Sequence, residues 1–284
     1  MNSIADAIKI IRDNLYGIVD NNEARHYAWL IFYHLRKYSQ TDMLLKGGEL
    51  LTKEEISFIN SAINRLKQSE PIQYVLGVTE FMGFTFKVDK RVLIPRPETE
   101  ELVEWILRVI SKPDINILDI GTGSGVIPVS IKKLRPETNV FAWDISEDAL
   151  IVAKENALLN SVDINFKRVD ILQYQADKHL FDIIVSNPPY VTYGEKSQML
   201  KNVLDFEPHT ALFVPDNDSL LFYRAIAKFS LESLKPGGVL YFEINETFGN
   251  ETVELLKSYG FVSIELKKDI SEKDRMIKAY IAES

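Results

Sequence analysis

The chain has 284 residues, carries a formal net charge of −8 and contains no cysteine. Its length suits one full doubly wound domain plus a smaller one, and no apolar run approaches the length of a membrane span. The lack of cysteine excludes a disulfide framework, a cysteine-based zinc site and a cysteine nucleophile. The acidic charge disfavours long duplex DNA as a ligand, because phosphate contacts need clustered Lys and Arg.

Two further features bear on location and metals. Residues 1–13 mix Asp and Lys into an amphipathic helical pattern, so no signal peptide is expected and the cytoplasm is the predicted location. The four histidines show no metal-binding cluster, so no metal site is expected.

Residues 4–67 have helical spacing of apolar residues throughout. Ile8, Ile11 and Leu15 recur at intervals of three and four, and Thr52 to Glu55 has the residue types that open a helix. This pattern predicts a small helical bundle over residues 1–74.

Apolar residues alternate about Gly83 in the segment 80–88, as they do in a β-hairpin. The segment leads into Pro95-Arg96-Pro97. We therefore expect a hairpin connector over residues 75–95, with the second domain spanning residues 96–284.

A buried-strand pattern at 115–120 is followed by the loop 121–125, with the sequence Gly-Thr-Gly-Ser-Gly, and by helical spacing from 126 to 134. The glycines permit a tight turn and let a ligand lie against bare backbone. A dinucleotide fingerprint would need glycine at position 126, which is Val126. The residues of a phosphate-binding P-loop and of a hydrolase elbow are also absent from this loop.

Acidic residues follow the next two predicted strands. Asp144 ends the strand 139–143, where it can accept from both hydroxyls of a ribose, and Ser146 is placed to cap the next helix. Asp170 and Ile171 end the strand 164–169, where they could offer a carboxylate and an apolar wall to an adenine ring.

Asn187-Pro188-Pro189-Tyr190 follows the buried strand 181–186. Two prolines stiffen the loop and remove two backbone donors, which leaves an acceptor-rich corner. The Asn187 carbonyl oxygen and the flat ring of Tyr190 suit a planar group that bears an NH2, either an amide or an exocyclic amine.

The remaining pattern predicts a helix at 219–234 that Pro236-Gly237-Gly238 terminates, a strand at 239–244, a helix at 252–259 and strands at 261–266 and 275–281. Strands therefore alternate with helices, which indicates an α/β, doubly wound fold. The four ligand loops are expected along one edge of its sheet.

With these motifs the chain resembles the class I S-adenosylmethionine-dependent methyltransferases, and within them the HemK/PrmC family of protein-glutamine N5-methyltransferases, over nearly its whole length. The segment 93–100, with the sequence Leu-Ile-Pro-Arg-Pro-Glu-Thr-Glu, is the most specific feature of this resemblance. Asn245, where the family usually has glycine, and Phe206, where it often has tyrosine, depart from the family pattern. Both are expected to affect only local packing or substrate detail.

The resemblance implies a seven-stranded Rossmann-like sheet whose last strand is antiparallel. It also implies S-adenosyl-L-methionine as cofactor, and class I peptide-chain release factors as substrates that are methylated on the glutamine of their Gly-Gly-Gln motif. The bundle is expected to recognise this substrate, and the enzyme to act as a monomer without a membrane or a nucleic-acid substrate.

The motifs and the resemblance together define the predicted site. Its cofactor-binding residues are Gly121, Thr122, Gly123, Ser124, Gly125, Asp144, Asp170, Ile171 and Asn187. Its catalytic residues are Asn187, Pro188 and Tyr190, and its substrate-binding residues are Asn187, Pro188, Pro189 and Tyr190. Arg96 and Glu98 could clamp the cofactor or the substrate loop, or form a salt bridge between the domains.

Three other functions compete with this interpretation. A nucleic-acid methyltransferase acting on an exocyclic amine of adenine or guanine would need a basic groove, and the helical segment shows no obvious basic stripe. A non-catalytic nucleotide-binding module would have no use for Asn187 and two prolines beside a cofactor. An NAD-dependent dehydrogenase is disfavoured by Val126.

Overall fold

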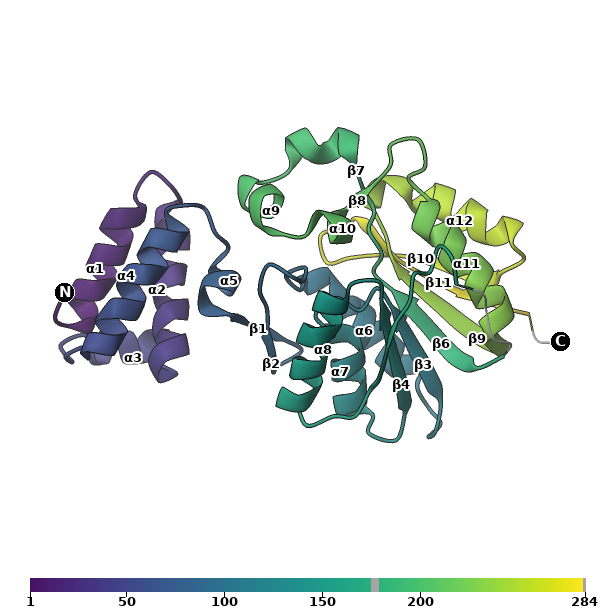
Figure 1. The fold of residues 1–284 in the computed structure, drawn as a ribbon, viewed down its shortest axis with the longest axis horizontal. Helices are drawn as coiled ribbons and strands as arrows, with labels where there is room; N and C mark the ends of the chain where they lie inside the picture. Colours follow the sequence, from purple (N-terminus) through teal and green to yellow (C-terminus); the bar gives the residue numbers. More distant parts are fainter. Residues whose placement is uncertain (175–178, 283–284) are drawn as a thin grey trace. The chain divides into compact units, whose positions relative to one another are not determined.

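The computed structural model describes residues 1–174 and 179–282, and the chain divides into two compact units (Figure 1). Unit 1 comprises Met1–Gly77 and Leu200–Phe206, and unit 2 comprises Val78–Met199 and Glu207–Ser284. The boundaries expected after residues 74 and 95 stay predictions.

Unit 1 is helical in all its regular elements among the described residues. These are α1 (Ile4–Leu15), α2 (Asn21–Arg36), α3 (Gln40–Leu45), α4 (Lys53–Leu66), α5 (Ile72–Leu76) and α9 (Lys201–Phe206). Ser3 and Thr52 each cap a helix by accepting from a backbone N–H three residues on, which satisfies an otherwise unpaired donor. The apolar stripes that the 3.6-residue spacing predicts form one core cluster that includes Ile11, Ile31 and Ile59.

The described residues of unit 2 form a seven-stranded sheet in the order β10-β11-β9-β6-β3-β4-β5. Its strands are β3 (Asn116–Ile120), β4 (Asn139–Asp144), β5 (Asn165–Arg168), β6 (Phe181–Ser186), β9 (Leu234–Glu243), β10 (Val262–Lys268) and β11 (Asp274–Tyr280). Neighbours from β5 to β9 pair parallel, whereas β11 pairs antiparallel with both β9 and β10. The predicted fold class and its antiparallel last strand are confirmed.

Helices cover both faces of this sheet (Figure 1). One face contacts α6 (Pro97–Val109), α7 (Val126–Leu134) and α8 (Glu147–Leu159), and the other contacts α11 (Leu221–Ser233) and α12 (Gly249–Ser258). Side chains alternate between the two cores along the inner strands: Ile117 lies in the first cluster and Leu118 in the second. This two-sided burial explains why β6 and most of β3 and β4 are apolar, whereas the edge strand β5 is mostly exposed and polar.

The predicted hairpin is confirmed. Strands β1 (Val78–Phe81) and β2 (Phe84–Lys87) pair antiparallel across a two-residue turn. Met82 and Gly83, at its centre, have φ of 51° and 76°, the positive values that suit the twist of paired strands.

The region between β6 and α11 contains short elements that the sequence pattern does not predict. They are β7 (Val191–Thr192), the 3-10 helix η1 (Tyr193–Gln198), α10 (His209–Leu212) and β8 (Phe213–Val214) in unit 2. Strands β7 and β8 pair parallel with each other. A further 3-10 helix, η2 (Glu246–Phe248), follows β9.

The prediction for residues 236–238 is wrong. Helix α11 already ends at Ser233, and β9 begins at Leu234 rather than at residue 239. Leu234 pairs with Phe181, and the register shifts before the next pair, so Pro236-Gly237-Gly238 forms an irregularity inside the strand. Pairing with β6 therefore outweighs the local turn signal.

No helix among the described residues has the length and apolarity that a membrane span requires. The same residues contain no group of three or more His, Asp or Glu side chains placed to hold a metal ion.

Candidate active site

The carboxyl ends of β3, β4 and β6 open into a cavity of about 730 Å³ within unit 2. This volume is in the range of small-molecule sites. Among the predicted site residues, those that line it are Gly121, Gly123, Asp144, Asp170, Ile171, Asn187, Pro188 and Pro189. The predicted residues outside this lining are Thr122, Ser124, Gly125 and Tyr190. The sheet edge thus brings most of the predicted site together.

The glycine loop between β3 and α7 is fixed against β4. The backbone N–H groups of Gly121 and Thr122 both donate to the carbonyl of Trp143, at 2.8 and 3.0 Å. Gly125 has a φ of +79°, and a Cβ there would lie 3.0 Å from the Cβ of Ala153 in α8. Glycine at position 125 therefore permits both the backbone conformation and the close approach of α8.

Asp144 links the glycine loop to the start of α8. Its Oδ2 accepts from the Gly123 N–H at 2.8 Å, and its Oδ1 accepts from the Ser146 N–H at 2.9 Å. Ser146 caps α8 by accepting from Ala149, as predicted. Burial raises the pKa of Asp144. A carboxylate has about four acceptor sites, so two remain for a ligand in the cavity.

Asp170 and Ile171 form another part of the lining, after β5. Asp170 is half-buried and accepts from the Leu172 N–H at 3.0 Å and from the Gln173 side chain at 2.7 Å. Ile171 and Leu172 add apolar surface. This part of the cavity combines an acceptor with an apolar wall.

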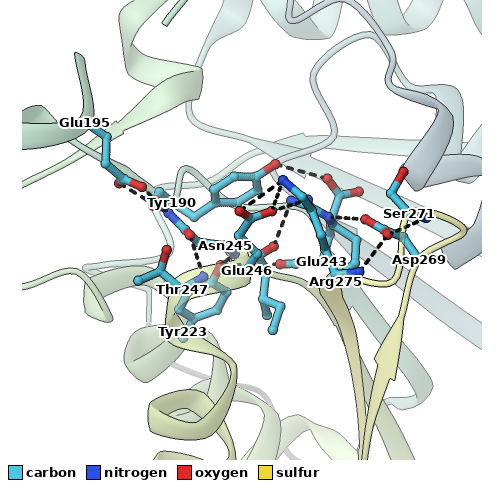
Figure 2. A network of polar contacts seen from close by, with 12 residues as sticks. Tyr190, Glu195, Tyr223, Glu243, Asn245, Glu246, Thr247, Asp269, Ser271 and Arg275 are labelled. Carbon is cyan, nitrogen blue, oxygen red and sulfur yellow. Dashed lines mark hydrogen bonds and ion pairs between the residues drawn. The ribbon is translucent and has the colours of Figure 1, made fainter. Parts of the chain in front are cut away.

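The polar side chains of the loop after β6 point in two different directions. Asn187 lines the cavity, and its Nδ2 donates to Thr99 Oγ1 at 3.3 Å. Tyr190 instead directs its hydroxyl to Glu243 Oε1 at 3.2 Å, as Figure 2 shows. Burial, with the charge of Glu243, raises the pKa of Tyr190. The tyrosine ring is half-buried against the core cluster of α11 and α12.

Asn245, the departure from the family pattern, also holds this loop (Figure 2). Its Nδ2 donates to the backbone carbonyl of Tyr190 at 3.1 Å and to Glu195, while its Oδ1 accepts from the Thr247 N–H. A glycine at this position would have none of these contacts. Asn245 therefore stabilises the loop at its tyrosine end.

The cavity has further lining residues that are absent from the predicted site, and two groups of them form separate walls. They are residues 90–93, and a group from the short elements that comprises Tyr193, Pro208, His209, Thr210, Ala211 and Phe213. The rings of Tyr193 and Phe213 stack at 5.1 Å between centroids. The nearest signals in the sequence are the segment 93–100, which carries the family resemblance, and Phe206, which departs from the family pattern; neither shows what these walls contact.

Arg96 and Glu207 join those two segments. Arg96 Nη2 lies 2.7 Å from Glu207 Oε1, and Glu207 Oε2 accepts from the Ile94 N–H at 3.2 Å. Only 1% of the Glu207 side chain is exposed. Arg96 thus forms an ion pair within unit 2 that holds the 208–213 wall beside residues 93–96.

Family models match both parts of the chain. The PrmC N-terminal domain matches residues 18–77, and the methyltransferase small domain matches residues 101–206. A release factor glutamine methyltransferase of Flavobacterium psychrophilum is 48% identical over 93% of this chain and 94% of its own length. The chain belongs to the release factor glutamine methyltransferase family. A second relative of that name, from Bacteroides thetaiotaomicron, is 42% identical over 95% of this chain and 97% of its own length.

Membership of the release factor glutamine methyltransferase family confirms the resemblance and the predicted enzyme class. Solved structures agree in fold. The catalytic domain of hMettl16, in complex with a MAT2A 3′UTR hairpin, gives a TM-score of 0.59 at 15% identity, over 89% of this chain and 92% of that one. A methyltransferase from Pyrococcus furiosus gives 0.53 at 18% identity, over 71% and 90%.

Proposed function

We propose that this chain transfers a methyl group from S-adenosyl-L-methionine to the side-chain amide nitrogen, N5, of the glutamine in the Gly-Gly-Gln motif of peptide-chain release factors. Two relatives named release factor glutamine methyltransferase match nearly the whole chain. The observation that carries the chemistry is the cavity itself, in which Asp144 and the Asn187-Pro188-Pro189 loop line one volume.

The cavity lining fits S-adenosylmethionine. The cofactor is a cation with a ribose and an adenine, and the lining supplies the carboxylates of Asp144 and Asp170, the apolar Ile171 and the bare backbone of Gly121 and Gly123. Asp144 is assigned to the ribose hydroxyls, and Asp170 with Ile171 to the adenine. Three residues of the glycine loop do not line the cavity, and their role is to shape the loop: Thr122, Ser124 and Gly125.

The bound cofactor supplies an activated methyl group on its sulfonium. An amide nitrogen is a poor nucleophile, because its lone pair is delocalised into the carbonyl. Asn187 Oδ1 and the Pro188 carbonyl accept the two N–H groups of the substrate glutamine and turn the nitrogen lone pair toward the methyl group. Positive charge that develops on the nitrogen is stabilised by these same two acceptors. The methylated nitrogen is strongly acidic and loses one of its two protons to water, which leaves the neutral N-methyl amide.

The other predicted roles follow from this assignment. Pro189 stiffens the loop, and Tyr190 holds its far end through Glu243. Residues 1–74 serve as the substrate-recognition bundle, residues 75–95 as connector and residues 96–284 as the methyltransferase domain. The enzyme acts as a monomer on class I release factors in the cytoplasm.

A labelling experiment tests the function. The purified protein is incubated with methyl-labelled cofactor and one of three substrates: a release factor, the same factor with its Gly-Gly-Gln glutamine changed to alanine, or duplex DNA. Label is expected only in the unmodified release factor. Label in DNA alone would replace this function with that of a nucleic-acid methyltransferase.

Asn187→Ala tests the mechanism in the same assay. It should lower kcat by about 10² to 10³ and leave cofactor affinity within a few fold, because Asn187 acts mainly in the transition state. Asn187→Asp keeps an acceptor and should retain more activity than the alanine variant. Wild-type turnover by Asn187→Ala would remove the residue from the mechanism.

A further inference from the structure

A buried carboxylate lies behind the Asn187-Pro188-Pro189-Tyr190 loop. Glu243 ends β9, the strand that pairs with β6, and only 1% of its surface is exposed. It does not line the cavity. A carboxylate in such a position needs partners that offset the cost of its burial.

Those partners connect Glu243 to Asn187. Thr99, in the first turn of α6, donates its hydroxyl proton to Glu243 Oε2 at 2.7 Å. Thr99 Oγ1 in turn accepts from Asn187 Nδ2 at 3.3 Å. Thr99 is itself buried, with 3% of its surface exposed.

The direction of these two hydrogen bonds has a chemical consequence. An ionised carboxylate can only accept, so it takes the single hydroxyl proton of Thr99. The threonine oxygen can then only accept from Asn187, which must present its NH2 group to Thr99. The carbonyl oxygen of the Asn187 amide is thereby left for the cavity.

We propose that Glu243 and Thr99 are positioning residues that fix the orientation of the Asn187 amide, so that Oδ1 rather than Nδ2 faces the substrate. This inference rests on the proposed function. It adds a cause for the amide orientation that the methyl transfer requires, and it assigns a role to two residues outside the cavity lining.

The charge of Glu243 is central to this role. The groups that face the carboxylate are Arg275 from β11, Glu98 from α6 and the Tyr190 hydroxyl, while the Tyr223 hydroxyl from α11 donates to the Glu243 backbone carbonyl. Figure 2 shows the Tyr190 hydroxyl and Arg275 beside the carboxylate, and the Tyr223 hydroxyl beside the backbone carbonyl of Glu243. Burial raises the pKa of Glu243 to about 6, although Thr99 and Arg275 favour the ionised form. The carboxylate is therefore ionised at neutral pH and becomes a possible donor in mild acid.

A neutral group at position 243 would no longer fix the orientation of the Asn187 amide. Either a protonated Glu243 or a glutamine can donate to Thr99 Oγ1, which frees the threonine proton to point at Asn187. The Asn187 amide can then turn its oxygen to Thr99 and its NH2 to the cavity. A donor in place of the acceptor would repel the N–H groups of a substrate amide.

Four variants separate this role from general structure. Glu243→Gln keeps shape and removes the charge, Thr99→Val removes the hydroxyl link, and Thr99→Ser retains it. Glu246→Gln is the matched control, because Glu246 is an exposed carboxylate that pairs with Arg275 and Lys273. Single-turnover methylation of a release factor is measured at saturating cofactor, and cofactor affinity is measured by calorimetry.

Glu243→Gln and Thr99→Val should each lower the rate at least about tenfold, with the cofactor dissociation constant within about twofold of wild type. Thr99→Ser and Glu246→Gln should stay within about threefold of the wild-type rate. The double variant Glu243→Gln/Thr99→Val should be no slower than the slower single variant. The wild-type rate should fall below about pH 6, and the rate of Thr99→Val should lack that decline.

The proposal would be overturned if the rate losses of the two single variants multiplied in the double variant. A wild-type rate in Thr99→Val would overturn it as well. If Glu243→Gln does not fold, the comparison of Thr99→Val with Thr99→Ser decides alone. Side-chain amide NMR gives a readout without turnover: a contact between the Asn187 NH2 protons and Thr99 should be present in wild type and lost in Glu243→Gln. A wild-type enzyme that fails to methylate release factors but retains this contact would contradict the proposed function and not the amide orientation.

Discussion

Asp119 should destabilise the folded chain at neutral and alkaline pH, and Asp119→Asn should remove that cost. The carboxyl lies in β3 with 1% of its surface exposed, and burial raises its pKa from 3.8 to about 7. Between these values the folded state retains a proton that the unfolded state has released, so the free energy of unfolding falls as pH rises. At about 1.4 kcal/mol per pKa unit, the interval corresponds to about 4 kcal/mol.

Urea unfolding of wild type and Asp119→Asn from pH 4 to pH 8 measures this effect. The free energy of unfolding of the variant, minus that of wild type, should grow by about 4 kcal/mol across the range. Any constant cost of burying the new amide cancels in this comparison. Asp182→Asn is the control: its carboxylate pairs with Lys235 at 2.7 Å and accepts from the Asn116 N–H, so its loss should lower stability. A difference for Asp119→Asn that stays flat with pH would refute the reasoning.

Three further predictions concern the cofactor loop and the bundle. Asp144→Ala should weaken cofactor binding by about 1.5 to 3 kcal/mol, roughly tenfold or more, in a calorimetric titration; an unchanged dissociation constant would remove Asp144 from the site. Deleting residues 1–70, in a protein shown by circular dichroism to remain folded, should preserve cofactor binding and abolish methylation of an intact release factor; full activity would give the bundle another task. Gly125→Ala should lower the free energy of unfolding by about 1 to 3 kcal/mol, because its Cβ would lie 3.0 Å from Ala153. Gly123→Ala, which meets no atom within 4 Å but lines the cavity, should cost less stability and more cofactor affinity; equal stability losses would contradict this.

The bounds of a helix or strand were predictable where two independent sequence signals marked the same residues. The bounds of β6 (Phe181–Ser186) and α7 (Val126–Leu134) agree with the prediction, because an apolar pattern and a proline or glycine loop mark the same residues. The start of β9 was not predictable in this way. Its first residue is decided by pairing between Leu234 and Phe181, and local sequence shows only the Pro-Gly-Gly turn signal.

The same distinction holds for the candidate site, in which some residues were predictable from the sequence and others were not. Asp144, Asp170 and Asn187 follow strands of one parallel sheet, and parallel strands bring their carboxyl ends to one edge. No comparable rule shows, from the sequence, which residue a buried polar group will contact. Glu243 is 53 residues from Tyr190 and 144 from Thr99 in the sequence, so only the folded chain shows that one carboxylate contacts both.

The position of β11 has a consequence for how the protein is made. The strand lies between β9 and β10 and hydrogen-bonds to both, yet synthesis produces β9 and β10 first. Until residues 274–280 leave the ribosome, the nascent sheet has an open edge at β9, which can pair with other chains. Chaperones that shield this edge would therefore matter most late in translation, when the cofactor loops have already been synthesised.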